Sequence, residues 1–335
     1  MGERFSELKR LNNSLINMNK CLSLQLDLKL DECKFEKIRN SVLSKPYSKK
    51  IQLKDQTRFT RIIENMWINE IYLKQSIIQN KDIWEIPLKS IDGEEKNSSM
   101  VMIRGNNHFF YMDYVAFYYS IFNSISLLTV LFHQDGKLKQ HEGKIHKFNI
   151  RICEMEYIKN ILPKPFSIVI CNDYCYINNQ NNKVNSNFHK LLDSYIKINE
   201  KNEKQKTLSG ENLITECENS LRFCRSLTKA YLKNTRKKSF SFIDYLLSFR
   251  HYFHYNCSVT LDHSEYDFDR LIHEIRENCY SLLVIFNYYI ELLFYNFTKY
   301  ELKEIFDKFK KKLDLKSHGV KEELTSEINY RIKLI

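Results

Sequence analysis

Glycine and proline are scarce in this chain, and that scarcity limits the folds available to it. The 335 residues include only 7 Gly and 4 Pro. A sheet-rich fold needs tight turns at short intervals, and these two residue types form many of those turns. We therefore expect an all-α fold, built as a bundle of long helices.

The apolar content is sufficient for a substantial core. Hydrophobic residues make up 43% of the chain and aromatic residues 13%, which excludes an intrinsically disordered protein. The most apolar segment, 112–133, is long enough to cross a membrane. Polar residues such as Asp113 and Asn123 recur along it, so we interpret it as a buried helix of the bundle and expect no membrane partner.

The charge balance leaves two interpretations open. Lys and Arg number 52 against 41 Asp and Glu, which gives a formal net charge of +11. A positive excess suits a polyanion partner such as RNA. Alternatively, the basic residues form an ordinary solvated surface, since they are spread along the chain rather than gathered in one block.

Cysteine usage indicates a reducing compartment. The nine Cys are odd in number and irregular in spacing, and the N-terminus has no charged-then-apolar signal segment. We therefore expect a cytoplasmic protein with free thiols. Cys171 and Cys175 have no second ligand pair nearby, and His189 does not complete a set of four ligands. No metal site and no cofactor are expected.

Periodicity and chain breakers divide the sequence. Charged and turn-forming residues at 80–99 favour a boundary between an N-terminal helical extension, 1–100, and a helical domain, 101–335. The alternating apolar residues near an Asn-rich turn predict a small inserted β-hairpin at 166–177. Apolar spacing predicts helices over 5–45, 58–79, 112–133, 150–162 and most of the chain from 213 onward, with a polar connection at 135–149.

An arginine and two histidines interrupt one of the most apolar predicted helices, within the stretch "DYLLSFRHYFHYN". Arg250 and His254 are four residues apart, so their Cβ atoms lie about 6 Å apart on one helix face. A histidine titrates near neutral pH and can move a proton of a ribose 2′-OH. A forked guanidinium can stabilise the charge that develops on the attacked phosphate. This pair suits cleavage of RNA without a metal.

A purely structural role for these residues is the alternative. In that case Arg250 forms an ion pair with an adjacent helix, for example with Glu274 or Asp269, and the histidine is a satisfied core residue. A second set, His133, His141 and His146, lies on the predicted 133–147 loop. We interpret those three as solvated surface histidines, because a loop does not fix their positions.

The segment "FIDYLLSFRHYFHYN" resembles the signature helix of the HEPN family. In that family an Arg, usually followed by a polar residue, lies a few positions before a His near a helix end. Arg250, His251 and His254 match these three residues, although only three residues separate Arg250 from His254, one fewer than the usual minimum. The Tyr- and Phe-rich segment 113–148 is also similar to the helix and loop that precede the signature helix.

The resemblance implies a HEPN-type helical bundle that works as a metal-independent endoribonuclease, in a toxin or anti-phage defence system. Arg250, His251 and His254 are the implied catalytic residues, and Tyr255 and Asn256, at the helix end, are the expected RNA contacts. The implied partners are RNA, a second copy of the chain in a homodimer with a composite cleft, and an antitoxin or regulatory protein. A non-catalytic HEPN-like RNA-binding scaffold and a helical partner-binding module remain alternatives.

Overall fold

The computed structural model describes most of the residues that precede position 172 and follow position 265, together with a short stretch between them. The described residues are 2–25, 34–48, 50–79, 85–86, 101–102, 110–133, 141–163, 166–167, 169–171, 239–241, 243–244, 246–247, 250, 266–317 and 322–335. They are mostly helical, which confirms the all-α prediction at that level. The HEPN type remains a prediction.

Helices of up to 33 residues dominate the described part. In chain order the helices are α1 (Gly2–Gln25), α2 (Lys34–Leu43), α3 (Gln56–Gln79), α4 (Phe110–Phe132), α5 (His141–Glu154), α6 (Glu156–Ile161), α10 (Tyr266–Thr298), α11 (Leu302–Ser317) and α12 (Glu322–Leu334). The short strands are β1 (Glu85–Ile86), β2 (Val101–Met102), β3 (Val169–Cys171) and β4 (Ser239–Ser241).

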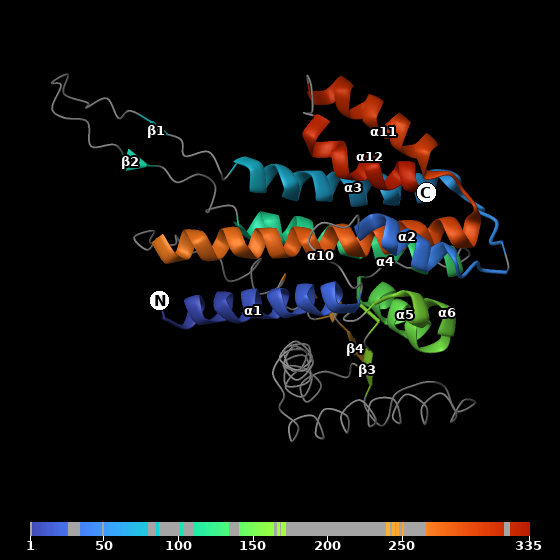
Figure 1. Ribbon diagram of the computed structural model, residues 1–335, viewed down its shortest axis with the longest axis horizontal. Helices are drawn as coiled ribbons and strands as arrows, with labels where there is room; N and C mark the ends of the chain where they lie inside the picture. The colour runs from blue at the N-terminus through green and yellow to red at the C-terminus, as the bar shows by residue number, and fades with distance from the viewer. Residues whose placement is uncertain are drawn as a thin grey trace.

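The helices are arranged in layers around α4 and α10 (Figure 1). The most extensive contacts join α3 to α4, α4 to α10, and α10 to α1. In Figure 1, α11 and α12 lie beyond α3 at the top, whereas α1 lies on the opposite side of α10. Helices far apart in the sequence therefore pack side by side, and the long α10 is buried between them.

Helix α3 follows the predicted 3.6-residue period. Phe59, Ile63 and Met66 are buried at 0–2% exposure, because their spacing of three or four residues places them on one helix face. Ile68 is 47% exposed, since it lies two residues after Met66 and therefore faces away from the core.

The predicted helix over 5–45 corresponds to two described helices, α1 and α2. The apolar face of α1 is buried as its spacing predicts, at positions Leu8, Leu11, Leu15, Met18 and Leu22. In α2 the buried residues are Phe35, Ile38 and Val42. Both helices contact α10.

The predicted polar connection at 135–149 is wrong for most of its length, because α5 begins at His141. Ile145, Phe148 and Ile152 are each about 1% exposed. Their spacing is helical, and burying this face against α4 outweighs the helix-breaking tendency of Gly143. The predicted 133–147 loop therefore does not exist as a loop where His141 and His146 lie.

The predicted hairpin at 166–177 is not formed as a local pair in the described part. β3 pairs antiparallel with β4, with Val169 opposite Ser241 and Cys171 opposite Ser239. Residues 172–177 lie outside the described residues. The prediction of helix from 213 onward is also wrong at β4, where a long-range partner strand overrides the local pattern.

Helix α4 explains how polar residues are tolerated in the most apolar segment. Ser120 Oγ donates a hydrogen bond to the Met66 carbonyl of α3 (2.8 Å), and Ser124 Oγ donates to Asn287 Oδ1 of α10 (2.6 Å). Among the described helices, Met112–Phe132 alone is long and apolar enough to span a membrane by composition, and most of it is buried inside the protein. The polar groups are satisfied by neighbouring helices.

Helices from both sides of the predicted boundary at residue 100 share one hydrophobic core. The same cluster of buried side chains extends from Leu8 in α1 to Ile332 in α12. The division into an extension, 1–100, and a domain, 101–335, stays a prediction.

Candidate functional site

The helical segment that carries Arg250 begins at a polar box directly after β4. The Ser241 backbone N–H and hydroxyl both donate to Asp244 Oδ2, at 3.0 Å each, while the Asp244 N–H lies 3.5 Å from Ser241 Oγ. This reciprocal pattern is that of a capping box, with Asp in place of the usual Glu. It satisfies donors that the first helical turn leaves open and fixes where the segment starts.

Helix α5 ties this box to the rest of the bundle. Asn149 Nδ2 donates to Asp244 Oδ2 at 3.0 Å, and both side chains are buried. The apolar side chains of Ile243, Leu246 and Leu247 are buried on the same segment. One polar network and one apolar face therefore anchor the segment that carries Arg250, six residues after Asp244.

Arg250 is half-buried against two tyrosines of α4. Its Nη2 donates a hydrogen bond to the Tyr119 hydroxyl at 3.0 Å. The guanidinium carbon lies 5.4 Å from the ring centroid of Tyr119 and 5.9 Å from that of Tyr118. Both distances fall within the range of cation–π attraction. Arg250 Nε is buried and has no hydrogen-bond partner among the described residues.

The groups that contact Arg250 are neutral. Among the described residues no carboxylate forms an ion pair with it. Glu274, one of the two partners expected from a structural role, instead accepts hydrogen bonds from Arg270 (3.1 Å) and Asn12 (2.9 Å). The side chain of Asp269, the other expected partner, lies outside the described residues. The positive charge of Arg250 is thus not neutralised by a protein group in the described part.

Arg250 is the predicted site residue that the structure describes. The other four, His251, His254, Tyr255 and Asn256, lie outside the described residues. The structure therefore fixes the arginine end of the predicted site and leaves the distance from Arg250 to His254 as a prediction.

The histidine set considered as an alternative is divided between two elements. His133 follows α4, whereas His141 and His146 belong to α5. Burial, together with the nearby charges of Lys147 and Arg151, lowers the pKa of His133. A lowered pKa keeps this imidazole neutral at physiological pH.

Sequence reasoning missed a fully buried ionic cluster at the junction of α3, α10 and α12. Arg331 Nη1 lies 2.7 Å from Glu70 Oε1, and its Nη2 lies 2.9 Å from Glu291 Oε1. The three side chains are 0–1% exposed. Trp67 Nε1 donates to Glu291 (2.8 Å) and Asn287 Nδ2 donates to Glu70 (2.7 Å). One signal was present, because Glu70 falls on the apolar stripe of α3.

Burial and neighbouring charges together determine the pKa values of this cluster. Burial raises the pKa of Glu291, and the attraction of Arg331 opposes that rise. For Arg331 itself, burial lowers the pKa, but the carboxylates of Glu291 and Glu70 outweigh burial and hold the pKa well above its usual value. The guanidinium therefore stays charged, and the cluster carries two carboxylates against one cation.

A second buried pair joins the start of α4 to α10. Arg276 Nε lies 2.6 Å from Asp113 Oδ2, and these side chains are 1% and 3% exposed. Burial raises the pKa of Asp113, although Arg276 acts in the opposite direction. Asp113, one of the polar residues that argued against a membrane helix, is therefore one half of an internal ion pair.

A search for metal-binding groups among the described residues and a comparison with known proteins both gave negative results. Within the part of the chain that the structure describes, no group of three or more His, Cys, Asp or Glu is arranged to hold a metal ion. Comparison of the chain with family models, curated proteins and solved structures finds no match.

Proposed function

We propose that this protein is a metal-independent endoribonuclease that cleaves RNA by attack of a ribose 2′-OH on the adjacent phosphate. The observation that carries the proposal is the charge of Arg250, which neutral tyrosines hold in place and no described carboxylate neutralises. A partly desolvated cation without an anionic partner has capacity left for an anionic ligand, and the phosphate of RNA supplies that charge.

The proposed chemistry divides the work between two residues. His254 takes the proton of the 2′-OH or returns one to the leaving 5′-oxygen. Arg250 stabilises the extra negative charge on the phosphorane. The products are a 2′,3′-cyclic phosphate and a free 5′-OH, so DNA, which lacks the nucleophile, is not a substrate.

The remaining predicted residues have supporting roles in this proposal. His251 orients the pair, while Tyr255 and Asn256 contact the RNA. The HEPN-like resemblance of the segment supports these assignments and implies that the sites of two protomers meet in a homodimer. The aromatic residues of α10 do not themselves require a dimer, because Phe286, Tyr288 and Phe294 are fully buried within one chain.

Cleavage of labelled single-stranded RNA in the presence of EDTA tests the proposal. We expect cleavage of RNA and none of DNA of the same sequence. His254→Ala should lower the rate by about 10²–10⁴, and Arg250→Ala by about 10²–10³. His251→Ala should have a smaller effect.

A second arginine and histidine three residues apart on α10 provide matched controls. Arg270 is 73% exposed and His273 about one-third exposed. Arg270→Ala and His273→Ala should cleave at the rate of the unchanged protein. The catalytic assignment is wrong if folded His254→Ala protein, checked by circular dichroism, cleaves RNA as fast as the unchanged protein.

The tyrosine contacts of Arg250 also support a second candidate, a helical partner-binding module in which Arg250 only joins its segment to α4. Stability separates the two candidates. A structural Arg250 predicts that Arg250→Met lowers the unfolding free energy, whereas a catalytic Arg250 predicts a large loss of rate with little loss of stability.

A further inference from the structure

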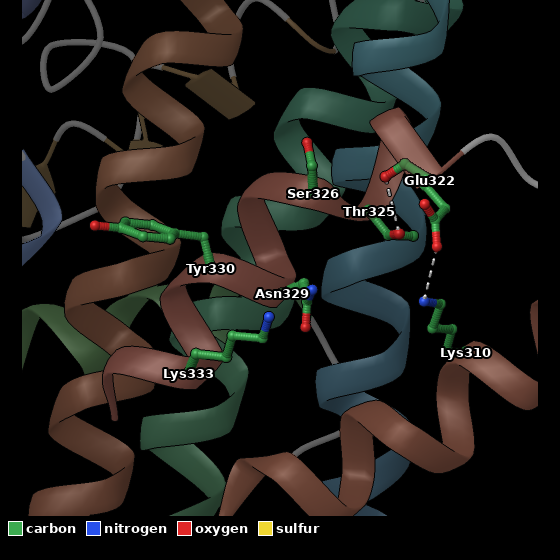
Figure 2. Close-up of a pocket in the computed structure, with 7 residues that line it drawn as sticks. All are labelled: Lys310, Glu322, Thr325, Ser326, Asn329, Tyr330 and Lys333. Carbon is green, nitrogen blue, oxygen red and sulfur yellow. Dashed lines mark hydrogen bonds and ion pairs between the residues drawn. The ribbon is translucent and has the colours of Figure 1, made fainter.

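A groove of about 290 Å³ lies between α11 and α12 (Figure 2), whereas Arg250 contacts Tyr119 of α4. Lys310 of α11 forms one wall. The other lining residues come from α12 and are Glu322, Thr325, Ser326, Asn329, Tyr330 and Lys333. Pockets for small molecules typically measure about 300–1,000 Å³, so the volume of this groove is close to that of the smallest such pockets.

Hydrogen-bond donors in the groove lack strong partners among the described residues. Lys310 Nζ lies 3.9 Å from Glu322 Oε1, and the Glu322 side chain is 94% exposed, so this ion pair is weak. Within the described residues Lys333 has no ion pair and Asn329 has no side-chain hydrogen bond. Two cations and an amide therefore line the same hollow.

An exposed aromatic ring borders these donors. Tyr330 is 39% exposed, whereas most other large apolar side chains of the described residues are buried. Phe35 of α2 packs against it, with ring centroids 6.0 Å apart. Since this contact holds the ring in place and leaves part of it open to solvent, the ring offers a platform for stacking.

We propose that this groove binds a phosphate-bearing nucleotide. The phosphate lies between Lys310 and Lys333, the Asn329 amide donates to a phosphate or sugar oxygen, and the base stacks on Tyr330. Glu322, the carboxylate in the groove, is exposed and turns away into solvent when the ligand binds. This site is separate from the proposed cleavage site, because its residues belong to α11 and α12.

Two probes distinguish a free nucleotide from a nucleotide unit of RNA. The first is ADP, measured by calorimetry. The second is a fluorescein-labelled uridine oligonucleotide with 2′-O-methyl groups, measured by anisotropy. The modified sugar lacks the 2′-OH nucleophile, so binding is measured without cleavage. Binding of ADP identifies a free nucleotide as sufficient, and binding of the oligonucleotide alone identifies RNA.

Charge neutralisation tests the groove. Lys310→Gln with Lys333→Gln should weaken binding about tenfold and, for the oligonucleotide, lower the salt slope by about 1.4, since each contact contributes about 0.7. The control is Lys45→Gln with Lys50→Gln, an equal loss of charge at exposed positions outside the groove. Equal weakening by the two pairs would overturn the proposal, as would failure of both probes to bind the unchanged protein.

Tyr330→Leu tests the stacking platform and keeps an apolar contact with Phe35. It should weaken binding about tenfold, with unchanged helicity by circular dichroism. The outcomes are independent of the ribonuclease proposal. If the protein does not cleave RNA but the groove variants bind more weakly, the groove proposal is supported and the ribonuclease proposal is not. If the protein cleaves RNA but the groove variants bind as tightly as the unchanged protein, the groove proposal is wrong and the ribonuclease proposal stands.

Discussion

Two arginines of this protein are held in opposite ways. Arg331 is 0% exposed and its guanidinium faces the carboxylates of Glu70 and Glu291. Arg250 is half-buried, and its guanidinium faces the Tyr119 hydroxyl and the rings of Tyr118 and Tyr119. Both arginines are immobilised by aromatic or acidic neighbours, yet only the first has its charge neutralised within the described residues.

The difference separates a charge that is paired inside the protein from a charge that can pair with an anionic ligand. A buried ion pair contributes little net stability against an apolar replacement, but loss of one partner leaves an uncompensated charge in the core. The Arg331 cluster therefore locks α12 to α3 and α10. The tyrosines around Arg250 supply orientation without neutralising charge, and an anionic ligand can complete that site.

The largest effect is expected from removing the neutralised arginine. Arg331→Met leaves Glu70 and Glu291 buried without their cation, which should cost about 3–5 kcal/mol of unfolding free energy. Urea denaturation followed by circular dichroism measures the change.

Arg270→Met is the matched control for this substitution. Arg270 is 73% exposed and pairs with Glu274 one turn away on α10, so its loss should cost less than about 1 kcal/mol. Equal costs for the two variants would show that the buried cluster has no special role in holding α12.

The comparison also shows which parts of the structure local sequence patterns can predict. The apolar stripes of α1 and α3 were predictable because helical spacing alone determines which face is buried. The pairing of Glu70 with Arg331 was not, because 261 residues separate them and nothing local marks one as the partner of the other. The β3–β4 pair escaped prediction for the same reason.

The candidate site also combines features that local sequence predicts with features that depend on packing. The helical character of the segment that leads to Arg250 was predictable from its apolar residues, and Ile243, Leu246 and Leu247 are buried. The contact of Arg250 with Tyr119, 131 residues earlier in the chain, and its lack of a pair with Glu274 depend on packing. Helix α5 was not predicted although a local signal for it exists. The helical spacing of Ile145, Phe148 and Ile152 was obscured by Gly136, Gly143 and charged neighbours.

A pH dependence of stability should reveal the excess carboxylate in the Arg331 cluster. Burial raises the pKa of Glu291 from 4.5 and that of Asp113 from 3.8. The folded protein then binds more protons than the unfolded chain. Both groups therefore favour folding below their ordinary pKa values and lose that contribution as pH rises through the raised values.

We therefore expect these two groups to increase the unfolding free energy as pH falls through their raised pKa values toward the ordinary values of 4.5 and 3.8. Glu291→Gln mimics the protonated side chain and should flatten that rise in urea denaturation series. Glu304→Gln, at an exposed position of α11, should leave the rise unchanged. An identical pH profile for Glu291→Gln and the unchanged protein would contradict the assignment.

The capping box gives a smaller and more local prediction on the Arg250 side. Ser241→Ala removes the hydroxyl that bonds Asp244, and loss of such a cap typically costs about 1 kcal/mol. Ser241→Thr keeps the hydroxyl and should restore most of the loss. If Arg250 depends on this segment for its position, RNA cleavage by the Ala variant should fall and recover with Thr.

The smallest change, Tyr119→Phe, tests how Arg250 is held. The substitution keeps the ring that lies 5.4 Å from the guanidinium and removes the hydroxyl that accepts its hydrogen bond. Loss of one such bond should cost about 0.5–1.5 kcal/mol. If Arg250 is purely structural, this cost appears in the unfolding free energy alone. If Arg250 acts on a phosphate, the free guanidinium loses its orientation, and kcat for RNA cleavage should fall about threefold to tenfold while KM changes little.

Tyr118→Phe, which keeps the other ring facing Arg250, is the control and should leave kcat unchanged. A drop in stability without a change in kcat would assign Arg250 to the same structural class as Arg331 and remove the contrast between them.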